Sequence, residues 1–190
     1  MVEIINSWAT PFGRSNRIFP QHDEILKLAR LSTTQDDRIN NRFVGGVEFL
    51  DDPIIVNLKQ WILSSVYYIA KEVNNWKEDH TPIITDMWSW SSNDYNNLLH
   101  GHANCSWSGI YCVEDGNGSV AGYNGTTVMF SPLPWGYYKD PGNDFLNLQF
   151  LHWHHLVPGD LLLFPSYVKH SAKYTGQDLR TVIGFDIAFK

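Results

Sequence analysis

Two histidines separated by a single residue, His100 and His102, are the first residues in this sequence whose spacing suggests chemistry. On a β-strand, side chains at positions i and i+2 point to the same face, so both imidazoles could enter one cavity. A third ligand from a distant strand would complete a facial metal site, which leaves positions on iron open for substrate and oxygen. The pair therefore predicts a metal site that needs one more protein ligand.

His170 is the candidate for that third ligand. A Pro-Gly-Asp turn at 158–160 and an apolar run at 161–164 precede it, which is typical of a buried strand that leads into a loop. Ten residues later comes Arg180, at the start of the last predicted strand. A buried arginine is costly unless an anion satisfies it, and a dicarboxylate would do so through paired hydrogen bonds.

Two sequence blocks resemble those of a known family. Residues 102–111, HANCSWSGIY, resemble the H-x-N-x-x-x-S-G-V/I-x-Y block of a family of 2-oxoglutarate/Fe(II) oxygenases common in bacteriophages and marine bacteria. Residues 159–166, GDLLLFPS, followed by His170 and Arg180, resemble its second block, and Trp88 or Trp90 matches an aromatic residue that precedes the first. The resemblance spans roughly 61–189 and is specific, because two separate blocks agree in sequence and spacing.

The resemblance implies a mainly β fold with N-terminal helices, in which the strands form a double-stranded β-helix, the cupin-like jelly roll. It implies Fe(II) held by His102 or His100 and by His170, with 2-oxoglutarate bound by Arg180 as co-substrate. The implied reaction uses O2 to convert 2-oxoglutarate to succinate while a C–H bond of a second, unidentified substrate is hydroxylated. In such reactions the protein supplies orientation and excludes water.

The sequence departs from the wider superfamily at the first pair of ligands, where most relatives have H-x-D and this chain has His102. Two ligand sets are therefore open. One is an all-histidine site, and the other adds a carboxylate from elsewhere in the chain. Asp115 and Glu114 are the nearest carboxylate candidates, although their position before Gly116 is also typical of a turn.

Three residues of the first block, Asn104, Ser108 and Tyr111, are candidates to bind 2-oxoglutarate or the second substrate through hydrogen bonds. The structural alternatives are close strand packing at Ser108 and a core position for Tyr111. A further group of histidines, His152, His154 and His155, is a rival metal cluster, for which a structural or supporting role is expected.

The remaining singled-out residues are expected to be structural. His22 and His80 are predicted to face solvent, and Cys105 and Cys112 to pack as small apolar groups. The Pro/Gly-rich segment 131–143 is predicted to be a loop that covers the mouth of the fold. Its aromatic side chains are candidate lid residues: Trp135, Tyr137 and Tyr138.

The elements that would position these residues fall into two regions. Segment 21–31 and a longer segment from Asp52 have the apolar spacing and terminal residues of helices. After 81–82, short apolar runs alternate with Gly, Asn and Pro clusters, which predicts an antiparallel sandwich or barrel. The predicted strands are 83–90, 108–113, 126–130, 148–157, 160–164 and 181–189. We expect one domain over 1–190, with helical support over about 1–80 and a jelly-roll core over about 81–190.

Charge and composition exclude several classes of function. The net charge is −6 and no segment is rich in Lys and Arg, which argues against nucleic acid as a direct partner. No apolar run approaches the length of a membrane span, and the first residues lack the features of a signal peptide. The expected location is the cytoplasm, of the host cell if the protein is phage-encoded. The sequence does not indicate an oligomeric state.

Three functions compete at this point. The first is an Fe(II)/2-oxoglutarate dioxygenase, most simply a hydroxylase. The second is a cupin-like three-histidine dioxygenase that acts without 2-oxoglutarate and so does not need Arg180 as an anion ligand. The third is a non-catalytic jelly-roll binding or structural module, such as a phage component, in which His100, His102 and His170 would not converge.

Overall fold

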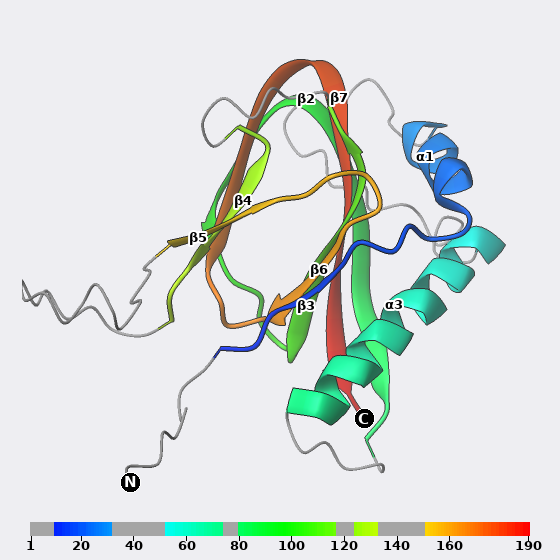
Figure 1. Cartoon of the computed structure of the whole chain (residues 1–190), viewed down its shortest axis with the longest axis vertical. Coiled ribbons are helices and arrows are strands. Elements are labelled where there is room, and N and C mark those ends of the chain that lie inside the picture. Colours follow the sequence, from blue (N-terminus) through cyan, green and yellow to red (C-terminus); the bar gives the residue numbers. More distant parts are fainter. Residues whose placement is uncertain (1–9, 32–51, 74–79, 117–123, 133–150) are drawn as a thin grey trace, which may run out of the picture.

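The computed structural model describes residues 10–31, 52–73, 80–116, 124–132 and 151–190. Most of these residues belong to one strongly curled β-sheet, with helices on its outer side (Figure 1). The fold confirms the predicted jelly roll with N-terminal helices. Its elements are β1 (Gly13–Ser15), α1 (His22–Leu31), α3 (Pro53–Val73), β2 (Pro82–His100), β3 (Trp107–Asp115), β4 (Thr126–Phe130), β5 (Leu151–His155), β6 (Leu161–Pro165) and β7 (His170–Phe189).

Strand β7 organises the sheet. The strand order is β1-β6-β3-β7-β4-β5, and β2 also pairs with β7. The second half of β7 pairs with β3, and its first residues pair with β4. Strand β2 pairs with β7 along most of its length. Irregularities in the β2–β7 register at 84/86, 92/94 and 97/100 mark bulges, which bend strands. β2 and β7 therefore arch over together, and the sheet folds back on itself (Figure 1).

Both long strands exceed the predicted ones, 83–90 and 181–189. The added stretches, including 93–97 and 173–179, are polar and largely exposed, so the sequence resembles turn segments there. Residues 94–97 pair with residues 172–175, so each strand supplies backbone hydrogen-bond partners to the other in this region. Long-range pairing has overridden the local signal.

The helices occupy the predicted positions and cover one face of the sheet. α3 buries an apolar stripe against it, formed by Ile55, Leu58, Ile62 and Val66. α1 packs beside it, and its Ile25 is fully buried. Among the described residues, no helix combines the length and apolarity needed to cross a bilayer.

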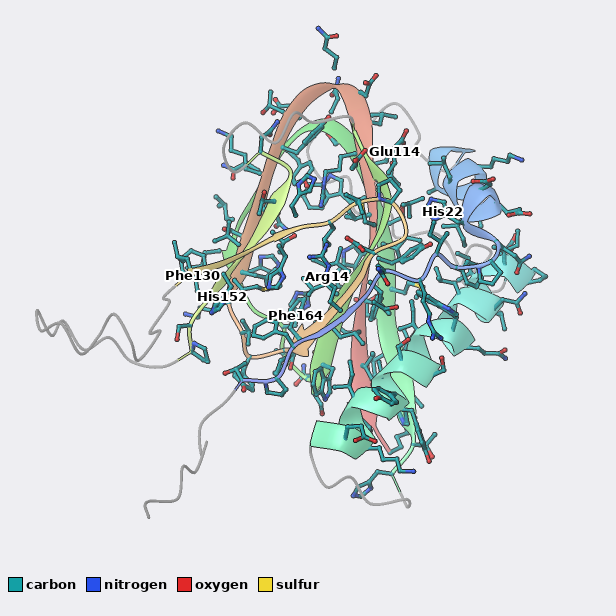
Figure 2. All side chains as sticks on the ribbon, in the orientation of Figure 1. Arg14, His22, Glu114, Phe130, His152 and Phe164 are labelled. Atoms are coloured by element: carbon teal, nitrogen blue, oxygen red, sulfur yellow. The ribbon has the colours of Figure 1, made fainter. Side chains whose placement is uncertain are left out.

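Alternation along β7 separates the core from the inside of the curl. Ile183, Phe185 and Ile187 belong to the core under the helices, whereas Arg180, Val182 and Gly184 line a cavity on the opposite face. Inside the curl a second apolar cluster surrounds Phe164, which Figure 2 shows in the interior. Its members are Cys112, Met129, Leu156, Leu162, Phe164 and Val168.

The prediction that His22 faces solvent is wrong. Its Nδ1 lies 2.6 Å from the Tyr111 hydroxyl, and the two rings meet edge to face at 5.8 Å. The cause is the packing of α1 against β3, which brings His22 onto the buried Tyr111. His80 is exposed and Cys112 is buried, both as predicted, while Cys105 is half-buried.

The region predicted to be helical support also contributes a strand, β1, which pairs with β6 at one edge of the sheet. Arg14 of β1 donates to the His155 carbonyl on β5 at 3.0 Å and to Asp160 at 2.6 Å. Phe12 stacks on His154 at 5.7 Å. Side chains thus join β1 and β5, the two ends of the strand order. A three-residue strand without apolar alternation gave no sequence signal.

We expect Gly109→Ala to lower the free energy of unfolding by about 1–3 kcal/mol, as overpacking typically does. A Cβ at position 109 would lie 2.3 Å from the Phe185 ring and 2.8 Å from the Leu162 carbonyl oxygen. Urea unfolding followed by circular dichroism measures the effect. Gly101→Ala is the matched control, because its Cβ would meet nothing closer than 3.5 Å. Equal stability of the two variants would contradict the packing argument.

Candidate active site

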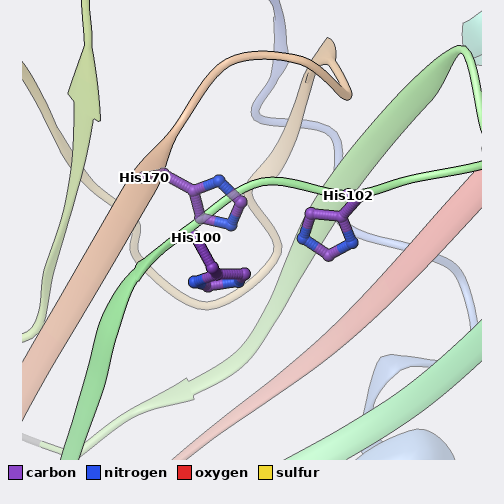
Figure 3. Close-up of side chains that lie close together, drawn as sticks. All are labelled: His100, His102 and His170. Atoms are coloured by element: carbon purple, nitrogen blue, oxygen red, sulfur yellow. The ribbon is translucent and has the colours of Figure 1, made fainter.

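Three histidines converge at one end of the curl. His100 is the last residue of β2 and His170 the first of β7, and the two are direct partners in the strand pairing. His102 follows in the connection to β3, where its N–H donates to the Ser166 carbonyl at 3.1 Å. Their candidate ligand atoms all lie within 4.8 Å of one another (Figure 3). In the described part of the chain, no other group of His, Cys, Asp or Glu side chains meets this criterion for a metal site.

The three rings form their hydrogen bonds through the same nitrogen, Nδ1. His100 Nδ1 lies 2.7 Å from the Leu98 carbonyl oxygen, and His170 Nδ1 lies 3.2 Å from that of Val168. A carbonyl oxygen only accepts, so in each ring Nδ1 carries the proton and Nε2 is the nitrogen with a lone pair. His102 Nδ1 lies 2.9 Å from Asp186 Oδ1. A carboxylate oxygen also only accepts, so this Nδ1 carries the proton as well. All three imidazoles are therefore prepared to bind a metal through Nε2.

Asp186 is a site residue that the sequence analysis missed. Besides His102, it accepts a hydrogen bond from Ser108 Oγ at 2.6 Å. Burial raises the pKa of this carboxyl, but the hydrogen bonds from His102 and Ser108 outweigh burial and hold the pKa below its ordinary value. Asp186 is thus a carboxylate at neutral pH. The available signal was an acidic residue inside the apolar segment 181–189.

His170 is the most buried of the three histidines, with 5% of its surface exposed. Burial, together with the neighbouring His100, lowers its pKa to about 4. The edge of Phe164 packs against the ring at 4.8 Å, which contributes to this burial. His170 is therefore neutral at physiological pH, the form in which imidazole binds metals.

His102 is held from two sides, by Asp186 and by the indole of Trp88. The two rings stack at 5.6 Å with an interplanar angle of 13°. Trp88 lies opposite Gly184 in the strand pairing, and a Cβ at position 184 would come within 2.4 Å of the indole. Gly184 therefore makes room for the ring that positions His102.

Arg180 lines the same cavity as the three histidines. It is 2% exposed, and its Nη1 donates to the Tyr95 hydroxyl at 2.5 Å. Within the described residues its Nη2 is buried without a hydrogen-bond partner. A buried cation with an unused donor favours an anion in the cavity. Without an anion, the cost of burying the charge and the cost of burying the unsatisfied N–H group are not compensated.

Neither carboxylate considered from the sequence belongs to the histidine cluster. Asp115 is the strand partner of Arg180, and Glu114 lies beside it, where its Oε2 accepts from Thr181 Oγ1 at 3.4 Å. The carboxylate that does reach a histidine is Asp186, and it contacts Nδ1 of His102.

The three polar residues of the first sequence block do not line the cavity. The Ser108 hydroxyl donates its hydrogen bond to Asp186. Tyr111 lies in the core under the helices, where its hydroxyl accepts from the Phe19 N–H at 3.3 Å. Asn104 is exposed and has a φ of 63°, so its place is a turn.

The rival histidines lie on β5, an edge of the sheet. His154 packs on Phe12, and burial lowers its pKa. His152 is exposed, and the backbone of His155 accepts from Arg14. The aromatic residues of the predicted lid, Trp135, Tyr137 and Tyr138, lie outside the described residues.

Comparison with protein families finds a match over residues 86–186, more than half of the chain, to the family described as "Putative 2OG-Fe(II) oxygenase". The matched segment contains His100, His102, His170, Arg180 and Asp186. No curated protein matches the sequence significantly.

Three solved structures illustrate the likeness of the fold. The non-heme alpha-ketoglutarate-dependent epimerase SnoN from nogalamycin biosynthesis has 11% identity and a TM-score of 0.65, over 94% of this chain and 76% of that one. HygX from Streptomyces hygroscopicus, with nickel and 2-oxoglutarate bound, has 12% identity and a TM-score of 0.61, over 94% of this chain and 83% of that one. A Pseudomonas putida prolyl-4-hydroxylase has 13% identity and a TM-score of 0.57, over 94% of this chain and 88% of that one. The family match, on this fold, establishes that the chain belongs to the 2-oxoglutarate- and Fe(II)-dependent oxygenases.

Proposed function

We propose that this oxygenase is a hydroxylase in which His100, His102 and His170 hold Fe(II) through Nε2, while Arg180 binds the distal carboxylate of 2-oxoglutarate. The observation that carries the proposal is the convergence of three oriented imidazoles in a cavity that also contains a buried arginine donor without a partner. The same donor favours this function over a three-histidine dioxygenase without 2-oxoglutarate, which would leave Arg180 unsatisfied.

The iron centre, when bound, supplies the oxidising chemistry: O2, 2-oxoglutarate and a C–H bond give succinate, CO2 and an alcohol, with one oxygen atom in each of the two organic products. The residues of the chain position the reactants. Val168 and Leu98 orient two of the ligands through their carbonyls, and Asp186 orients the third. Aromatic side chains, among them Trp88 and Phe164, line the cavity and limit the access of water.

Three neutral imidazoles bring no charge to Fe(II), so the negative charge must come from elsewhere. Asp186 supplies one negative charge through the hydrogen bond to His102, which makes that imidazole a stronger donor. The carboxylates of 2-oxoglutarate supply the rest. An all-histidine site can thereby serve in a superfamily whose usual pattern includes an aspartate ligand.

His170→Ala is expected to abolish stoichiometric Fe(II) binding, because it removes one of three ligands from the most buried position. The measurement is an anaerobic titration with Fe(II) and 2-oxoglutarate that follows the weak visible charge-transfer band of the chelate. His80→Ala, at an exposed histidine outside the cluster, should retain the band. Full iron binding by the His170 variant would rule out the proposed ligand set.

Arg180→Gln should raise the Kd of 2-oxoglutarate at least about a hundredfold while Fe(II) affinity stays unchanged, because a buried charge pair loses its cation. Calorimetric titration of the anaerobic Fe(II) protein measures both constants. Arg17→Gln, at an exposed arginine, is the matched control. Normal binding and decarboxylation of 2-oxoglutarate by the Arg180 variant would show that the anion site lies elsewhere.

Asp186→Asn should weaken Fe(II) binding by about 10–100-fold, the usual effect of losing a carboxylate that supports a histidine ligand. The amide has the size of the carboxylate but not its charge, so the change tests the electrostatic role of Asp186. Competition with a chelator of known affinity measures the loss, and Asp23→Asn on α1 serves as control. Equal Fe(II) affinities of the two variants would mean that Asp186 only fills space.

A further inference from the structure

Two buried hydrogen-bond donors line the cavity without a partner in the described part of the chain. Among the described residues, five buried side-chain atoms lack one: Ser89 Oγ, Trp90 Nε1, His154 Nε2, His155 Nδ1 and Arg180 Nη2. Only Trp90 and Arg180 among these residues line the cavity of the three histidines. Leaving a buried donor unsatisfied destabilises a protein, so two such donors in one cavity point to a shared acceptor.

The strand pairing places these donors on one face. Trp90 lies opposite Val182 and Ser92 opposite Arg180, so Trp90 and Arg180 are diagonal neighbours across β2 and β7. Diagonal neighbours have Cα atoms about 7–8 Å apart, within reach of long and aromatic side chains. An indole N–H and a guanidinium from these positions can therefore meet one ligand between them.

Tyr95 fixes the orientation of both donors. Its ring packs on Trp90 with a centroid distance of 5.0 Å, and its hydroxyl accepts a hydrogen bond from Arg180 Nη1. The Arg180 guanidinium carbon also lies 5.9 Å from the Tyr95 ring centroid. One edge of the guanidinium is thereby used within the protein, and Nη2 remains for a ligand.

We propose that Trp90 is a specificity-determining residue, whose Nε1–H binds the distal carboxylate of 2-oxoglutarate together with Arg180 Nη2. This inference rests on the proposed function, which gives that carboxylate to Arg180. A carboxylate has two acceptor oxygens, and the two unused donors match them one to one. The protein then selects a dicarboxylate over a 2-oxo acid with an uncharged end, because the latter leaves both donors unpaired.

The test compares two ligands in wild-type and Trp90→Phe protein, both anaerobic and loaded with Fe(II). The ligands are 2-oxoglutarate and 2-oxopentanoate, which keeps the 2-oxo acid end and lacks the distal carboxylate. Trp90→Phe should raise the Kd of 2-oxoglutarate about tenfold, because a hydrogen bond to a charged group is lost. The Kd of 2-oxopentanoate should change less than about twofold, since that ligand does not use the indole N–H.

Equal losses for the two ligands, or no loss for either, would overturn the role of Trp90. If Trp90→Phe fails to fold, benzothienylalanine at position 90 replaces the ring N–H by sulfur with little change of shape and gives the same comparison. Arg180→Gln separates this inference from the proposed function. If Arg180→Gln abolishes the preference for 2-oxoglutarate and Trp90→Phe retains it, only the Trp90 inference fails. If wild-type protein has no such preference, the Arg180 assignment fails as well.

Discussion

The pairing of β7 with β2 is the constraint on which both the core and the site depend. Because side chains alternate along a strand, β7 sends Ile183, Phe185 and Ile187 into the core under the helices. The intervening positions, from Arg180 to Asp186, face the inside of the curl. Burial of the apolar face fixes the register, since a slip of one residue would exchange the two sets. Burial of the apolar side chains of β7 thus also fixes the positions of the polar side chains on its opposite face.

Two charged side chains lie on that inner face, the buried Arg180 and the half-buried Asp186, and they are stabilised differently. Asp186 accepts hydrogen bonds from His102 and Ser108, so its charge is satisfied by the protein alone. Arg180 is satisfied on one edge, by Tyr95, and has an unused donor on the other. The first arrangement stabilises the folded protein and orients His102, a proposed ligand of the metal. The second leaves part of the cost of burying Arg180 to be offset by a bound anion. Under the proposed function that anion is 2-oxoglutarate, whose binding would then raise the stability of the protein.

The sequence predicted the fold class, both helices and the grouping of His100, His102 and His170, because these rest on local periodicity and on two specific blocks. It did not predict Asp186 or Tyr95, whose roles depend on partners 84 and 85 positions away in the chain. Strand lengths were underestimated for a similar reason. The polar middle of β2 is a strand because β7 lies beside it, and no local pattern encodes that pairing. For Tyr111 the sequence left a site role and a core position open, and the packing of α1 and α3 gives it the core position.

The histidine at position 102 changes how the site distributes charge. With an aspartate there, the negative charge would contact the metal directly and occupy a coordination position. Here the charge resides on Asp186, one imidazole away, and Trp88 and Asp186 together fix the plane of the intervening ring. Such a site attracts a cation less strongly by direct contact, so its affinity depends more on how rigidly the rings are held. The glycine at 184, which lets Trp88 lie against the strand, is therefore as much a requirement of the proposed metal site as the imidazoles themselves.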